Sequence, residues 1–122
     1  MDIYREEILE NWQNPQNFGK IKGANRIVRE INPLCGDRVT FYFKIKNGKI
    51  ADVSFEGGGC AISIAAASIL SGRIKGKRIQ SVWGLKGDTV LEMIGAKADF
   101  PPARLKCAFL ALEAVKKLKT NE

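Results

Sequence analysis

The chain has 122 residues, three cysteines, no histidine and a net charge of +7, with 20 Lys and Arg against 13 Asp and Glu. A chain of this length can bury one hydrophobic core, so we expect a single domain over residues 1–122. The missing histidine excludes Ser-His-Asp hydrolases, HExxH zinc enzymes and Cys2His2 zinc fingers, so any chemistry must come from Cys, carboxylate, Lys or Arg side chains.

The first predicted element is an amphipathic helix over residues 2–14, because Tyr4, Ile8 and Trp12 recur at helical spacing and Pro15 ends the pattern.

The N-terminal segment lacks the basic and then apolar pattern of a secretory signal peptide. No apolar run approaches the ~20 residues that a membrane-spanning helix needs. We therefore expect a cytoplasmic protein without membrane contact, whose odd number of cysteines favours reduced thiols over a disulfide framework.

Three strands are predicted next, the first at about residues 25–31. Apolar and polar side chains then alternate over residues 38–45 and again over residues 51–56. The Asn47-Gly48 pair between these two runs is typical of a tight hairpin turn. The pattern predicts a three-stranded antiparallel sheet with one buried face.

A buried helix is predicted over residues 61–71, after a run of three glycines, with Gly72 as its stop signal. A basic cluster follows, and it could neutralise the phosphates of a nucleic acid. No aromatic RNA-binding motif, GXXG loop or helix-turn-helix pattern accompanies this cluster, so an acidic protein partner is the favoured explanation of the charge. The cluster consists of Arg73, Lys75, Lys77 and Arg78.

Short helices complete the prediction. One lies around residues 79–83, and Thr89 and Glu92 have capping-box spacing at the start of another. A last helix begins after a double proline and carries an apolar stripe over residues 105–115. Strands followed by helices indicate an α+β fold, with the helices packed on one face of the sheet.

All three cysteines lie at boundaries between predicted elements. Cys35 separates the first strand from the hairpin, Cys60 follows the three glycines, and Cys107 lies in the first turns of the last helix. Free cysteines are often buried as small apolar residues, but three at element boundaries favour a functional site. Reactive thiolates need positive potential, which helix N-termini would supply to Cys60 and Cys107, with Arg104 and Lys106 beside the latter.

Asp37 completes the candidate site. It follows Cys35 by two residues, so both side chains share a face if the segment is extended. Cys35, Asp37, Cys60 and Cys107 then offer three sulfurs and one oxygen to a metal. Their spacing is unlike the Cys-x2-Cys pairs of zinc ribbons, so such a site would form only in the folded chain. The alternatives are a turn aspartate and structural cysteines.

Several stretches resemble the IscU, SufU and NifU N-terminal family of iron-sulfur cluster assembly scaffolds, and the resemblance covers nearly the whole chain. They are Asn14-Pro15, Cys35-Gly36-Asp37, Gly57-Gly58-Gly59-Cys60-Ala61-Ile62-Ser63 and Phe100-Pro101-Pro102-Ala103-Arg104-Leu105-Lys106-Cys107-Ala108. The resemblance implies that residues 1–122 form one scaffold domain that builds a [2Fe-2S] cluster from iron and desulfurase-derived sulfur and transfers it to acceptor proteins. It also implies that Cys35, Asp37, Cys60 and Cys107 hold the cluster or iron. Cys107 is then the first candidate persulfide acceptor and Cys35 the second.

Lys106 departs from the IscU pattern, which has a histidine immediately before the third cysteine. SufU-type members have lysine there, hold zinc with the same Cys and Asp set and act as sulfurtransferases, but they carry an insertion between the second and third cysteines that this chain lacks. The resemblance thus implies a non-enzymatic scaffold first and a zinc-dependent sulfurtransferase second. The basic charge leaves a third alternative, a nucleic-acid-binding domain whose cysteines are incidental. Lys106 would be auxiliary, pairing with Asp37 or lowering the pKa of Cys107.

The segment Phe-Pro-Pro-Ala-Arg, from Phe100 to Arg104, is similar to the Leu-Pro-Pro-Val-Lys segment by which an Hsp70-type chaperone recognises IscU-type proteins. The partners that the resemblance implies are a cysteine desulfurase, apo iron-sulfur acceptor proteins and such a chaperone. One chain or a homodimer could hold the cluster.

Overall fold

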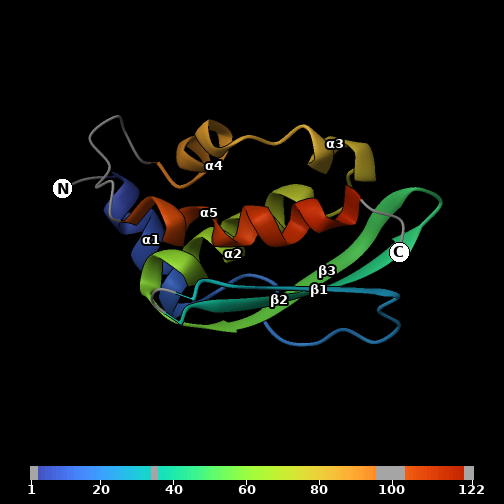
Figure 1. Ribbon diagram of the computed structural model, residues 1–122, viewed down its shortest axis with the longest axis horizontal. Helices are drawn as coiled ribbons and strands as arrows, with labels where there is room; N and C mark the ends of the chain where they lie inside the picture. Colours follow the sequence, from blue (N-terminus) through green and yellow to red (C-terminus); the bar gives the residue numbers. More distant parts are fainter. Residues whose placement is uncertain (1–2, 34–35, 96–103, 120–122) are drawn as a thin grey trace.

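The computed structural model describes residues 3–33, 36–95 and 104–119, which form a three-stranded antiparallel sheet with helices on one face (Figure 1). The predicted α+β fold class is therefore confirmed. In chain order the elements are α1 (Ile3–Gln13), β1 (Arg26–Ile31), β2 (Arg38–Lys46), β3 (Lys49–Gly58), α2 (Ala61–Ile74), α3 (Ile79–Trp83), α4 (Gly87–Met93), α5 (Leu105–Val115) and the 3-10 helix η2 (Lys116–Lys119).

The sheet has the strand order β1-β2-β3, and both neighbouring pairs are antiparallel. Asn47 and Gly48 join β2 to β3 with φ angles of 55° and 74°, the left-handed conformations that a two-residue hairpin turn of this type requires. The predicted hairpin is confirmed. Alternate residues of the strands point toward the helices, and the fully buried ones include Phe41, Phe43 and Phe55.

The helices α2 and α5 cover the inner face of the sheet (Figure 1). Small side chains such as Ala67, Ala111 and Ala114 are almost completely buried there, which lets the helix backbones approach the sheet and one another. Both helices begin at the end of the sheet where β2 begins and β3 ends. The fold therefore brings two helix N-termini to the same place as the segment that precedes β2.

Gly72 does not end α2, as the sequence had suggested. The helix continues to Ile74 and has Lys75 as its C-cap. A Cβ atom at position 72 would lie 2.5 Å from Oε1 of Gln16, so the segment after α1 packs closely against the helix at this glycine.

The predicted capping box at Thr89 and Glu92 is also wrong. The helix α4 begins at Gly87 with Lys86 as its N-cap, so Thr89 lies inside the helix. A Cβ atom at Gly87 would lie 2.9 Å from Cζ of Phe109, so the start of α4 packs closely against α5. Among the residues that the structure describes, no helix is long and apolar enough to cross a membrane.

Candidate metal centre

Asp37, Cys60 and Cys107 converge where the N-termini of α2 and α5 meet the start of β2. Asp37 directly precedes β2, Cys60 is the N-cap of α2, and Cys107 lies in the first turn of α5. One carboxylate oxygen and the two Sγ atoms all lie within 4.8 Å of one another. The structure thus brings together three of the four residues predicted for the site. The fourth, Cys35, lies outside the described residues, as do residues 100–103 of the chaperone-like segment.

The Asp37 carboxylate is held by groups at the start of α2. The backbone N–H of Cys60 donates to Oδ1 at 3.2 Å, and the Ser63 hydroxyl donates to Oδ2 at 2.6 Å. Asp37 is buried, so these hydrogen bonds replace the water that a carboxylate otherwise needs. The carboxylate thereby occupies the positive end of the α2 dipole.

Gly59 makes this arrangement possible. Its φ is 132°, and a Cβ atom there would lie 2.3 Å from Oδ1 of Asp37. A glycine is therefore needed at position 59 for the close approach of Asp37 to the start of α2.

The Cys107 thiol is buried, and its environment favours the protonated form. Burial raises the pKa of Cys107 to about 12, and the neighbouring Cys60 and Asp37 groups act in the same direction. The expected net lowering of the pKa of Cys107 is therefore wrong, because burial and the neighbouring Cys60 and Asp37 groups raise it. A bound cation would favour the thiolate, since metals bind cysteine in that form.

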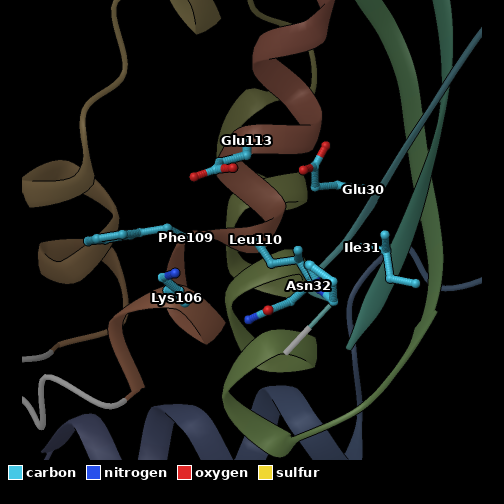
Figure 2. A pocket seen from close by; sticks show the side chains of 8 residues that line it. Glu30, Ile31, Asn32, Lys106, Phe109, Leu110 and Glu113 are labelled. Atoms are coloured by element: carbon cyan, nitrogen blue, oxygen red, sulfur yellow. The ribbon is translucent and has the colours of Figure 1, made fainter. Parts of the chain in front are cut away.

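Lys106 lies on a different side of α5 from Cys107. It lines a pocket of about 200 Å³ between the end of β1 and α5 (Figure 2). The ion pairs found among the described residues join Lys75 to Asp52 and Lys117 to Glu30, so the pairing of Lys106 with Asp37 stays a prediction. The other residues that line the pocket are Glu30, Ile31, Asn32, Pro33, Phe109, Leu110 and Glu113.

Ser63 is the residue of this centre that the sequence did not single out. Its oxygen lies 3.6 Å from Sγ of Cys60 and 3.3 Å from the carbonyl oxygen of Cys107, in addition to its bond with Asp37. The Cys-x-x-Ser spacing at a helix start was the available signal, because residues three apart share one side of a helix.

The donor set fits a metal that prefers sulfur. Two thiols and one carboxylate come from three elements and lie at distances that a single ion or a small cluster could bridge. The thiols favour zinc or iron over magnesium or calcium, which prefer sites made of oxygen alone.

Known proteins share both the sequence and the fold. A family model described as NifU-like N terminal domain matches residues 3–119. The iron-sulfur cluster assembly scaffold protein IscU 1 of Archaeoglobus fulgidus is 35% identical over 115 residues, which cover 94% of this chain and 73% of that protein. The zinc-dependent sulfurtransferase SufU of Bacillus subtilis is 33% identical over 131 residues, which cover 94% of this chain and 88% of that protein.

A solved structure agrees with these sequence relatives. A protein of Fervidobacterium islandicum, described as an iron-sulfur cluster assembly scaffold for the SUF system, superimposes with a TM-score of 0.76 at 30% identity, covering 94% of this chain and 95% of that one. The 131-residue alignment with the Bacillus protein is longer than this chain of 122 residues, so that relative carries residues that have no counterpart here. The extent of the match, the shared fold and the clustered Asp and Cys residues show that the chain belongs to the NifU-like N-terminal domain family.

Proposed function

We propose that this protein is a scaffold on which a [2Fe-2S] cluster is assembled and from which it is passed to acceptor proteins. The observation that carries the proposal is the convergence of Asp37, Cys60 and Cys107 within 4.8 Å, in a chain whose relatives include proteins named IscU scaffolds. The cluster is the cargo of the protein, and Cys35 would be its fourth ligand. A single domain over residues 1–122, in the cytoplasm, would carry out this role.

The mixed donor set suits a cargo that must leave. Permanent electron carriers hold such clusters with four thiolates, or with two thiolates and two histidines. A carboxylate is a harder ligand that matches this softer site less well, so the bond to Asp37 would be the most easily replaced. An incoming acceptor thiolate would therefore displace Asp37 first.

Sulfur would arrive as a persulfide on a cysteine desulfurase. The thiolate of Cys107, or of Cys35 as the second candidate, attacks the terminal sulfur, the S–S bond breaks, and the desulfurase cysteine leaves as a thiolate. Two electrons from an external thiol or another reductant then release sulfide. Because Cys107 is buried, docking of the desulfurase must open this end of the molecule before the attack.

A second function is a zinc-dependent sulfurtransferase. It is favoured by Lys106 and by the similarity to the Bacillus protein named SufU. Zinc would be held by Cys35, Asp37, Cys60 and Cys107, and it would stabilise their thiolates near neutral pH. Exchange of one zinc ligand would then free a thiolate for attack on the persulfide.

The proposed partners are a cysteine desulfurase and apo iron-sulfur acceptor proteins. The net charge of +7 favours acidic surfaces on these partners, and this attraction would weaken with added salt. An Hsp70-type chaperone would recognise Phe100 to Arg104, and a homodimer is one way in which the cluster could be held.

The decisive experiment is anaerobic purification with metal analysis, followed by reconstitution with iron, cysteine and a cysteine desulfurase. The scaffold function predicts visible charge-transfer bands and about two iron ions per site. Tight zinc binding without iron uptake would instead establish the sulfurtransferase, and no metal of either kind would contradict both functions.

The ligand set is tested by replacing one cysteine at a time. We expect metal binding to be lost in each of Cys35→Ser, Cys60→Ser and Cys107→Ser. A variant that still binds the metal would remove that cysteine from the site.

A further inference from the structure

Ser63 lies among the predicted ligands without being one of them. It follows Cys60 by three residues at the start of α2 and is buried together with Asp37. Its hydroxyl donates to Oδ2 of Asp37 at 2.6 Å, and the same oxygen lies within 3.6 Å of the Cys60 sulfur. A single hydroxyl therefore touches both the carboxylate and a thiol of the donor group.

The hydrogen bond between Ser63 and Asp37 competes with a metal for the same oxygen. It is short and has a charged acceptor, which makes it one of the stronger kinds of hydrogen bond. A carboxylate oxygen that accepts such a hydrogen bond donates less electron density to a bound cation. The other oxygen, Oδ1, accepts the backbone N–H of Cys60, so both oxygens have protein donors when the carboxylate is not bound to metal.

We propose that Ser63 is a positioning residue that stabilises Asp37 away from a bound metal and so sets how fast the metal or cluster leaves the site. The inference rests on the proposed function, because it takes Asp37 as a metal ligand. Ser63 would act through its short hydrogen bond to Asp37 and is not itself a ligand of the cargo. Because the site is buried, water cannot readily replace the hydroxyl once it is removed.

The test is the rate at which a chromophoric chelator in excess removes zinc from the purified full chain. Loss of a hydrogen bond to a charged group in Ser63→Ala should slow zinc removal about tenfold, because the carboxylate loses its competing donor. Ser63→Thr keeps a hydroxyl and should remain close to the unmodified rate. In the reconstituted protein, transfer of the iron-sulfur cluster to an acceptor should slow by a similar factor.

Two further variants separate this role from a structural one. In an Asp37→Ala background, Ser63→Ala should have no additional effect on the rate. Ser68→Ala is the matched control, because Ser68 is a buried serine of the same helix that hydrogen-bonds to Asn11 and Gln16 instead. It should lower thermal stability and leave the zinc rate unchanged.

Equal rates for Ser63→Ala and the unmodified chain would overturn the inference, as would faster removal, since that would mean Ser63 supports the bound carboxylate. If Ser63→Ala also slowed zinc removal in the Asp37→Ala background, the inference would be overturned as well. A chain that binds zinc, shows the slowing and builds no cluster would support the role of Ser63 while overturning the scaffold function. A chain that binds no zinc and builds no cluster would overturn both.

Discussion

Gly59 is the residue on which the geometry of the centre depends most directly. Gly59→Ala would combine a strained positive φ with a contact of 2.3 Å to Asp37, so the carboxylate must move. We expect a loss of ~1–3 kcal/mol in the free energy of unfolding and a loss of zinc binding. Urea unfolding and zinc stoichiometry measure the two effects.

Gly48→Ala is the matched control for this change. Its φ of 74° is also positive, but nothing lies within 4 Å of the added Cβ atom. It should cost stability through backbone strain alone and keep full zinc binding. If Gly59→Ala also bound zinc as the unmodified chain does, the close approach at Gly59 would not be what positions Asp37.

The two described cysteines should differ in reactivity. Cys107 is buried with its pKa raised to about 12, whereas Cys60 is partly exposed. At pH 8 the Cys107 thiol is almost entirely protonated, and its thiolate fraction grows only as the pH rises toward 12. In the chelator-treated protein, iodoacetamide should therefore modify Cys60 well before Cys107, as followed by peptide mass spectrometry. Alkylation of Cys107 at pH 8 as fast as that of free cysteine would contradict this assignment.

At the scale of elements, α1 is attached to α2 through polar groups. The Ser68 hydroxyl donates to Oδ1 of Asn11 at 2.6 Å, and the side-chain amide of Gln16 donates from Nε2 to the same oxygen at 3.0 Å. Leu9 and Trp12 on the same helix are exposed at 42% and 45%. Buried hydrogen bonds therefore help to hold α1 on the helical layer, together with the buried side chain of Ile8.

Asn11→Ala should destabilise the chain by ~1–3 kcal/mol, because Ser68 and Gln16 would lose a buried acceptor. Chemical unfolding measures this change, and Gln13→Ala on the exposed side of α1 is the control that should have little effect. Equal midpoints for the two variants would show that the polar contacts do not hold α1 in place.

Sequence patterns predicted those elements whose causes are local. The Asn47-Gly48 turn and the alternation in β2 and β3 depend on neighbouring residues, so the hairpin was predictable. The buried face of α1 was predicted only in part, because Ile8 is buried as the helical spacing predicts, whereas Trp12 is exposed and the polar Asn11 is buried against α2 instead. Gly72 was misinterpreted for a similar reason, since its contact with Gln16 joins distant parts of the chain.

The candidate site, too, was only partly predictable from the sequence. Its ligand types could be predicted from the positions of Asp37, Cys60 and Cys107 at element boundaries and from the family resemblance. The role of Ser63 could not, because the Cys-x-x-Ser spacing indicates only that Ser63 and Cys60 share one side of α2, and the fold alone places Asp37 beside them. The raised pKa of Cys107 likewise depends on burial and on neighbours that only the fold supplies.

At the scale of the whole molecule, the candidate metal centre connects the start of β2 to α2 and α5, the two helices that cover the sheet. A metal held by Asp37, Cys60 and Cys107 would bind only the folded chain, because these residues are far apart in sequence. Zinc at about 100 times its dissociation constant should therefore stabilise the fold by ~2.7 kcal/mol. For a domain of this size we expect a rise in Tm on the order of 10 °C, measured by thermal unfolding with zinc and with chelator.

Cys107→Ser gives the control for this coupling, because it removes a predicted ligand and replaces the thiol with a hydroxyl of similar size. Its unfolding transition should remain cooperative, and the difference in Tm between zinc and chelator should largely disappear. A zinc-dependent rise that persists in Cys107→Ser would mean that the metal binds elsewhere on the chain. A Tm of the unmodified protein that does not respond to zinc would show that the three elements do not form a metal site together.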